Sequence, residues 1–171
     1  KSIAKDNTLI PYFDTLKNKS YVISGGTRGV GLSIAKSLSN KGANVALLGK
    51  TSKPHPKLEG TLSSAVEEVK KANYCGDNKV IGIKCDIRDY NNVNDAVEEI
   101  VKKFKRINGV VLNASALCLN STFKQTKKEI DLMSQVNING TFIVGQKCLK
   151  YIVKENHGNV LVIAPPIAML N

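Results

Sequence analysis

The stretch Tyr21-Val22-Ile23-Ser24-Gly25-Gly26-Thr27-Arg28-Gly29-Val30-Gly31-Leu32 decides how this chain folds. Its first part belongs to a β-branched and aromatic run, Ser20 to Ser24, which is typical of a buried strand. The run stops at two glycines, and a helical pattern follows at once with one broad apolar face, formed by Leu32, Ile34, Ala35 and Leu38. This order is typical of a site for a nucleotide phosphate, because glycines let the backbone approach the ligand and the helix N–H groups point at the anion.

The glycines of this loop are spaced Gly25-x-x-x-Gly29-x-Gly31, which differs from the Gly-x-Gly-x-x-Gly of many dinucleotide-binding proteins. A glycine cluster alone also occurs in flexible turns. The strand and the helix that flank it favour a dinucleotide site here. We therefore predict a cofactor-binding loop made of Gly25, Gly26, Thr27, Arg28, Gly29, Val30 and Gly31.

Length and composition are those of one globular domain: 171 residues, 42% of them hydrophobic and 23% charged. The net charge of +11 raises the alternative of a nucleic-acid partner. However, the lysines are scattered in short groups at the ends of predicted helices, without the interleaved aromatic residues of single-strand binders. We predict no nucleic-acid binding, and no membrane span either, because no apolar run approaches roughly 20 residues.

The cysteines indicate a reducing compartment. Four are present and show neither Cys-x-x-Cys pairing nor a metal-ligand spacing with the two histidines, so no metal site is predicted. Cys85, Cys118 and Cys148 lie in apolar contexts, where we expect reduced core residues of a cytoplasmic protein. Because the chain begins at Lys1 without an initiator methionine, we expect a partial sequence from which targeting signals are missing.

Strand and helix patterns alternate along the rest of the chain. The first helix is expected to end at Asn40-Lys41-Gly42, with the glycine as its cap. Beyond it we predict strands over 45–48, 79–85, 110–112 and 159–164, and helices over 61–72, 91–104 and 129–153. The alternation predicts an α/β fold, a doubly wound parallel sheet with three αβα layers (Rossmann-like). Residues 1–18 are interpreted as an N-terminal extension, and 19–171 as a Rossmann-type NADP-binding domain that is incomplete at its C-terminus.

Four motifs arrive in the order expected of one family. They are Ser24-Gly25-x-x-x-Gly29-x-Gly31, Cys85-Asp86-Ile87, Asn113-Ala114-Ser115 and Val136-Asn137-Ile138-Asn139-Gly140. With these motifs the chain, from about residue 19 to its end, resembles the short-chain dehydrogenase/reductase family. The loop 50–58, the segment 131–133 and the pair Pro165-Pro166 are similar to one particular member of that family.

The resemblance implies an oxidoreductase that transfers hydride between a nicotinamide cofactor and a carbonyl or alcohol substrate. It implies that Asp86 and Ile87 contact the adenine, that Asn113 and Ala114 lie at the cofactor, and that Asn137 holds a water and a local kink beside the catalytic centre. By the same resemblance the substrate is a small, lipid-like molecule and the full-length protein is a homo-oligomer. A peroxisomal or mitochondrial location is the alternative to a cytoplasmic one.

Two cations predict that the cofactor is NADP. Lys50 stands at the end of the second strand, where NAD enzymes place an acid for the ribose 2′-hydroxyl. A lysine attracts a 2′-phosphate that an acid would repel, and Arg28 in the glycine loop can approach from the other side. The alternative is that Lys50 is an ordinary solvated lysine. With Arg28 in place and no acid expected nearby, we predict that Lys50 binds the cofactor.

The polar residues after the third and fourth strands have two readings each. Asp86 could cap the next helix, but Asp89 leads directly into it and is the expected cap, which leaves Asp86 free to accept from the adenine amino group. Asn113 could tie strands together or contact the cofactor. Asn137 lies inside a long helical pattern, where asparagine competes for backbone hydrogen bonds, and such a misplaced residue is often functional.

The catalytic groups of the family depart from its pattern here. The position of its substrate-orienting serine falls on Pro165, which carries no donor. Its Tyr-x-x-x-Lys pair has no match, since Glu155 follows Tyr151 at that spacing, and we expect the pair beyond Asn171. We predict that Ser115 partly replaces the missing hydroxyl. The alternative is a non-catalytic NADP-binding module.

Overall fold

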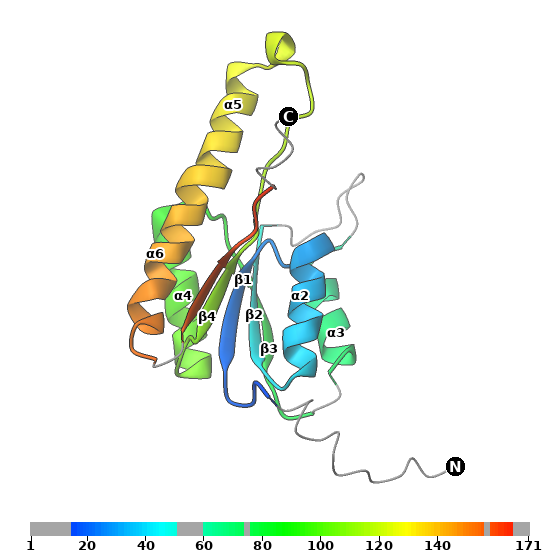
Figure 1. Ribbon diagram of the computed structural model, residues 1–171, viewed down its shortest axis with the longest axis vertical. Coiled ribbons are helices and arrows are strands. Elements are labelled where there is room, and N and C mark those ends of the chain that lie inside the picture. The colour runs from blue at the N-terminus through cyan, green and yellow to red at the C-terminus, as the bar shows by residue number, and fades with distance from the viewer. Residues whose placement is uncertain (1–14, 51–59, 74–75, 156–157, 166–171) are drawn as a thin grey trace, which may run out of the picture.

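The computed structural model describes residues 15–50, 60–73, 76–155 and 158–165. Its centre is a five-stranded parallel sheet in the order β3-β2-β1-β4-β5 (Figure 1). The strands are β1 (Ser20–Ser24), β2 (Asn44–Gly49), β3 (Val80–Lys84), β4 (Gly109–Leu112) and β5 (Asn159–Val162). Chain order reverses on either side of β1, which pairs with β2 and with β4. In such sheets ligands bind where the order reverses, outside the carboxyl ends of the strands.

Helices cover both faces of the sheet and complete three layers (Figure 1). On one face lie α2 (Gly29–Asn40) and α3 (Leu62–Lys71), and on the other α4 (Tyr90–Phe104) and α6 (Thr141–Ile152). Alternate side chains of the central strands enter the two layers, as the period of a strand requires. Ile23, Val45 and Leu47 belong to the core beneath α2 and α3, and Val22, Ala46 and Leu48 to the core beneath α4 and α6. The predicted Rossmann-like αβα fold is confirmed.

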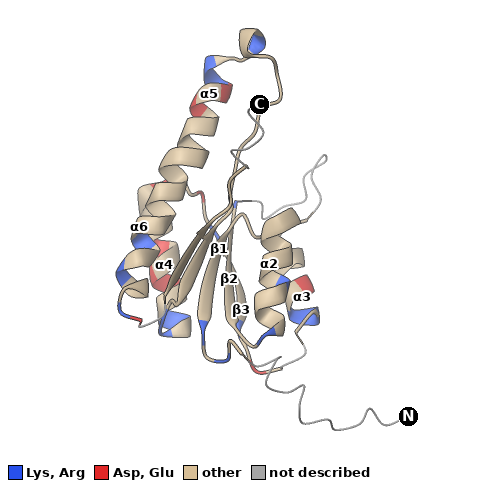
Figure 2. Ribbon diagram, in the orientation of Figure 1, with Lys and Arg blue, Asp and Glu red and all other residues tan. Residues whose placement is uncertain are grey.

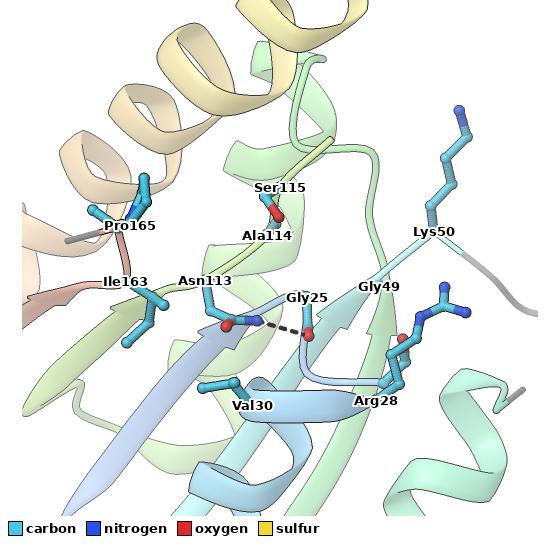
Figure 3. A pocket seen from close by; sticks show the side chains of 12 residues that line it. Gly25, Arg28, Val30, Gly49, Lys50, Asn113, Ala114, Ser115, Ile163 and Pro165 are labelled. Atoms are coloured by element: carbon cyan, nitrogen blue, oxygen red, sulfur yellow. Dashed lines mark hydrogen bonds between the residues drawn. The ribbon is translucent and has the colours of Figure 1, made fainter. Parts of the chain in front are cut away.

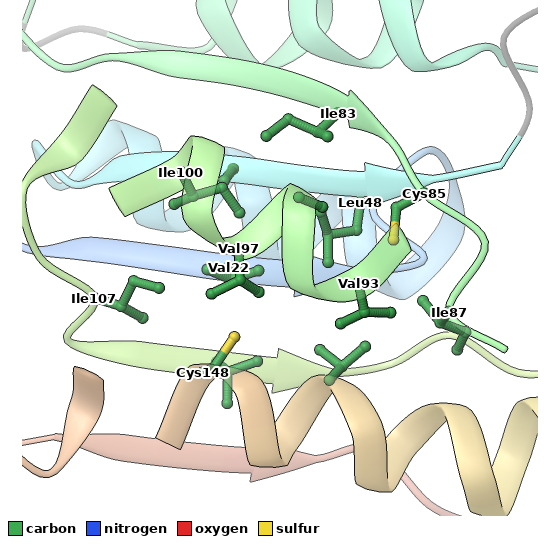
Figure 4. Packing of buried hydrophobic residues seen from close by; sticks show 14 of the residues in the cluster. Val22, Leu48, Ile83, Cys85, Ile87, Val93, Val97, Ile100, Ile107 and Cys148 are labelled. Atoms are coloured by element: carbon green, nitrogen blue, oxygen red, sulfur yellow. The ribbon is translucent and has the colours of Figure 1, made fainter. Parts of the chain in front are cut away.

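The core beneath α4 and α6 is closely packed (Figure 4). Two free thiols lie in it, Cys85 and Cys148, and burial raises the pKa of each to about 12. These thiols therefore stay protonated and unreactive near neutral pH. Cys118 differs from the prediction, because it lies in the loop after β4 and is only half-buried. Cys75 lies outside the described residues.

The helix ends follow the capping residues of the sequence. Gly42 follows α2 with a positive φ of 85°, as a glycine cap requires. Asp89 caps α4, since its side chain accepts from the N–H groups of Asn91 and Asn92. Both predictions are confirmed. Thr61 caps α3 through a reciprocal pair with Ser64, so that helix begins one residue later than predicted.

The prediction of one regular α-helix over 129–153 is wrong. The structure has α5 (Lys127–Met133), then a π-helical segment η2 (Ser134–Gly140), then α6. The wider turn of a π-helix adds a residue without ending the helix, and such segments are frequent at functional sites. Asn137 lies in η2, so the expected local distortion at this residue is present.

The charged residues are distributed over the whole fold, and the helices are of ordinary length and polarity. Lys and Arg residues occur in both helical layers, among acidic residues (Figure 2). In the described part of the chain no helix is both long and apolar enough to cross a membrane. Residues 1–14 of the predicted N-terminal extension lie outside the described residues.

Candidate cofactor-binding site

A pocket of about 640 Å³ opens at the carboxyl ends of β1, β2 and β4 (Figure 3). The loops that follow β1, β2, β4 and β5 line it. The lining residues are Gly25, Thr27, Arg28, Val30, Gly49, Lys50, Asn113, Ala114, Ser115, Ile163, Ala164 and Pro165. Eight of the predicted site residues are therefore brought together here: Gly25, Thr27, Arg28, Val30, Lys50, Asn113, Ala114 and Ser115.

Two glycines of the loop are required by close packing. Gly25 has a positive φ of 68°, and a Cβ atom on it would lie 2.8 Å from the Cα atom of Ala114. A Cβ atom on Gly31 would lie 2.5 Å from the carbonyl oxygen of Gly25. Gly25 lines the pocket, whereas Gly26 and Gly31 do not, and Gly26 packs on the side chain of Leu47. These glycines hold the loop against β2, β4 and α2.

Gly29 has a different role. Its φ is +54°, yet no atom lies within 4 Å of the place where its Cβ would stand. It is the first residue of α2, and Arg28 before it is extended and provides no side-chain cap. The N-terminus of α2 therefore presents backbone N–H groups beside open space, which is the arrangement that binds a phosphate.

Ser24 and Asn113 tie β1 to β4. The Oγ atom of Ser24 accepts from the N–H groups of Asn113 and Ala114, both at 3.1 Å, and donates to the carbonyl oxygen of Val111 at 3.4 Å. The side-chain amide of Asn113 donates to the carbonyl oxygen of Ser24 at 3.3 Å. It also donates to the carbonyl oxygen of Gly25 at 3.0 Å (Figure 3). Asn113 thus ties two strands together, which was one of its two expected roles, and it lines the pocket as well.

Asn137 acts on the wall of the pocket through the loop after β4. Its Oδ1 accepts from the N–H of Ala116 at 2.8 Å, and its Nδ2 donates to the carbonyl oxygen of Ala116 at 2.9 Å. This pair of bonds fixes η2 to the residue that follows Ser115. Ser115 itself is exposed and lines the pocket.

Asp86 is not free, contrary to the prediction. Its Oδ2 atom lies 2.6 Å from Nη2 of Arg88 and 3.1 Å from Nζ of Lys50, and its Oδ1 accepts from Nε of Arg88 at 2.9 Å. The hydrogen bond from Arg88 is the main reason that the pKa of Asp86 lies well below its usual range. The expectation that no acid lies near Lys50 is therefore wrong.

The cause of this error is strand register. Gly49 pairs with Lys84 across β2 and β3, so Lys50 and Asp86 leave the sheet side by side. The signal that could have found the pair is that both residues follow predicted strands of a parallel sheet, whose carboxyl ends meet at one edge. Ile87, the other residue predicted at the adenine, has its side chain in the core against Gly140, so any contact with a cofactor comes from its backbone.

Four further residues line the pocket that were not predicted as part of the site, namely Gly49, Ile163, Ala164 and Pro165. Gly49 lies so close to Thr27 that its Cβ would stand 2.7 Å from that side chain. Ile163, Ala164 and Pro165 form the wall at the end of β5 and offer no hydroxyl group. Tyr151 lies on α6 between Lys150 and Lys154 and does not line the pocket. Among the described residues no group of three His, Cys, Asp or Glu could hold a metal ion.

This fold is that of a known family. The sequence pattern described as short chain dehydrogenase matches residues 19–169, and the chain belongs to that family. Among solved structures, a short chain dehydrogenase from Mycobacterium thermoresistibile is 40% identical with a TM-score of 0.83, over 89% of this chain and 53% of that one. A Serratia marcescens short-chain dehydrogenase/reductase variant is 28% identical with a TM-score of 0.74, over 87% and 56%.

The particular relatives are hydroxysteroid dehydrogenase-like proteins. The chain is 36% identical to hydroxysteroid dehydrogenase-like protein 2 of Bos taurus, over 93% of this chain and 37% of that protein. It is 38% identical to the Danio rerio protein, over 85% of this chain and 34% of that protein. This is the member that loop 50–58 resembles, although residues 51–58 lie outside the described residues. The chain thus spans about a third of these relatives and about half of the solved structures.

Members of this family bind nicotinamide cofactors, and the residues of the pocket fit such a group. At the start of α2 the backbone is open to a ligand, because Gly25 and Gly29 both have positive φ and Gly29 faces open space. Arg28 and Lys50 lie on one side of the pocket and Ile163 and Pro165 on the other, with Ser115 between them (Figure 3). A dinucleotide with a charged, phosphate-bearing half and a less polar reacting half matches this distribution.

Proposed function

We propose that this chain is the cofactor-binding part of an NADP(H)-dependent short-chain oxidoreductase that acts on a carbonyl or alcohol substrate. The observation that carries the proposal is the polarity of the pocket. Its phosphate end combines the uncapped N-terminus of α2 with two cations, Arg28 and Lys50. Its other end combines a hydroxyl group with apolar side chains, those of Ser115, Ile163 and Pro165.

Each part of the pocket has a proposed task. The first N–H groups of α2 and the glycine loop hold the pyrophosphate. Arg28 and Lys50 contact the 2′-phosphate, which NAD lacks. The nicotinamide supplies hydride chemistry when it is bound, and the walls from β4 and β5 keep water away from it. The backbone of Ile87 remains a proposed contact of the adenine, whereas the carboxylate of Asp86 is already engaged by Arg88 and Lys50.

Reduction of a carbonyl group requires a group that donates the proton and a hydrogen-bond donor to the substrate oxygen. Pro165 stands where the family has its serine and has neither an N–H nor a side-chain donor. We assign the hydrogen bond to the substrate oxygen to Ser115, which Asn137 positions through Ala116. The tyrosine and lysine of the family have no counterpart in residues 1–171 and are proposed to lie in the longer protein.

The alternative is a non-catalytic NADP-binding module. The absence of a hydroxyl group at Pro165 favours it, whereas family membership and the presence of Ser115 in the pocket favour the oxidoreductase. A lipid-like substrate, a homo-oligomeric full-length protein and a cytoplasmic location, or else a peroxisomal or mitochondrial one, stay predictions from the sequence.

Titration of the chain with NADPH and with NADH, followed by cofactor fluorescence, tests the cofactor assignment. We expect NADPH to bind about tenfold more tightly, since a charge-assisted contact contributes roughly 1.5 kcal/mol or more. Equal dissociation constants would contradict the choice of NADP. Failure of both cofactors to bind would contradict the site itself.

A further inference from the structure

Lys50 stands between two anions, one fixed in the protein and one that belongs to the proposed ligand. Its side chain is 66% exposed and lines the pocket, and its Nζ lies 3.1 Å from Oδ2 of Asp86. Asp86 does not line the pocket. An ammonium group that forms an ion pair with Asp86 is therefore within reach of a phosphate bound in the pocket.

Arg88 holds Asp86 independently of Lys50. It donates to both carboxylate oxygens, at 2.9 Å from Nε and 2.6 Å from Nη2, and its backbone N–H lies 3.2 Å from Oδ1. The backbone N–H of Asp86 in turn donates to Oδ1 of Asn92 at 2.7 Å. The carboxylate therefore keeps its charge and its place if Lys50 leaves, in agreement with the lowered pKa of Asp86.

From this geometry we infer that Asp86 is a positioning residue that sets the selectivity between NADPH and NADH through Lys50. In the protein without cofactor, Asp86 holds the ammonium group of Lys50 at the rim of the pocket. A 2′-phosphate competes with Asp86 for that group, while NADH leaves the pair intact. This inference rests on the proposed function, because it needs a 2′-phosphate at Lys50.

The direction of the effect follows from the charges. Asp86 places a negative charge beside the position of the 2′-phosphate and occupies one of its two cations, so it weakens NADPH binding. An exposed ion pair contributes about 0.2–1 kcal/mol, which corresponds to a factor of roughly 1.5–5 in affinity. Removing the charge of Asp86 therefore tightens NADPH binding by that factor and leaves NADH binding almost unchanged.

The test compares Asp86→Asn with the unaltered protein, using NADPH and NADH titrations at fixed ionic strength. Asparagine keeps an oxygen that accepts from Arg88. Glu99→Gln removes the same charge from an exposed pair with Lys103 on α4 and serves as the matched control. We expect the ratio of the NADH to the NADPH dissociation constant to rise about 1.5- to fivefold in Asp86→Asn, and not in Glu99→Gln.

A second pair of variants tests the route through Lys50. In a Lys50→Ala background, Asp86→Asn is expected to leave the ratio unchanged. An unchanged or falling ratio in Asp86→Asn alone overturns the inference. Equal losses for both cofactors also overturn it, because they indicate that Asp86 contacts the adenine or only supports the loop.

One measurement needs no substitution and stays decisive if Asp86→Asn fails to fold. The carboxyl carbon resonance of Asp86 is expected to shift when NADPH is added and to stay in place with NADH. A shift with both cofactors, or with neither, overturns the inference. Failure of the proposed function looks different, since the unaltered protein then shows no preference for NADPH.

Discussion

Strands β1 and β5 have similar apolar sequences but opposite surroundings. Ile23 of β1 is 0% exposed at the centre of the sheet, whereas Leu161 of β5 is 48% exposed at its edge. β5 is apolar on both faces, which is typical of a strand covered on both sides. The proposed phosphate end of the pocket thus rests on buried strands, and the opposite end rests on an exposed one.

The largest expected effect is on stability, and it measures this contrast directly. We expect Ile23→Ala to lower the free energy of unfolding by about 2–5 kcal/mol, because it opens a cavity beneath α2 and α3. Leu161→Ala removes a side chain that is half in solvent, so its cost is roughly 1 kcal/mol or less. Urea unfolding of the chain measures both. Equal costs would show that β5 is as well packed as β1.

Next in size is the loss of cofactor binding in Gly29→Val. A branched side chain would fill the open space at the start of α2, and we expect NADPH affinity to fall by on the order of a hundredfold, or about 2.7 kcal/mol. Gly76→Val is the matched control, since Gly76 also has positive φ and open surroundings but lies between α3 and β3, away from the start of α2. A folded Gly29→Val protein that NADPH still stabilises against heat would contradict this assignment.

Ser115→Ala tests the opposite end of the pocket. In the full-length protein we expect turnover of a carbonyl substrate to fall on the order of a hundredfold, with NADPH affinity unchanged, because a transition-state donor is lost. Ser121→Ala, on the same loop but outside the pocket, is expected to change neither property. Unchanged turnover in Ser115→Ala would show that the residue only fills the loop, and would favour the non-catalytic module.

The smallest effect concerns Lys50. We expect Lys50→Ala to weaken NADPH binding up to about tenfold and NADH binding little, since the lost contact is to the 2′-phosphate. Lys36→Ala removes an equal charge from an exposed pair with Glu68, and it is expected to leave both affinities unchanged. Similar losses for the two cofactors after Lys50→Ala would mean that Lys50 does not distinguish them.

The sequence predicted well what depends on local pattern. The apolar runs of β1 and β2 and the caps Gly42 and Asp89 are present as expected, because burial and capping select residue types directly. The glycine loop was recognised for the same reason. Two of its glycines, Gly25 and Gly31, are required by neighbours that only the fold supplies.

What the sequence did not predict depends on distances between elements. The pair of Lys50 and Asp86 arises from the register of β2 with β3, which no local pattern specifies. The π-helical turn of η2 has no composition of its own, although the asparagine inside it was an indication. The role of Ser24 as an anchor for the loop after β4 also emerged only when β1 and β4 were placed side by side.

The paired hydrogen bonds between Asn137 and Ala116 have a mechanical consequence. A side-chain amide here occupies both backbone groups of a loop residue, much as a neighbouring strand would. We therefore expect the loop that carries Ser115 to move together with the continuous helical segment formed by α5, η2 and α6. The amide hydrogen of Ala116 lies outside any strand or helix and is bonded to Asn137. Its rate of exchange with solvent would therefore report how often the contact between η2 and this loop opens.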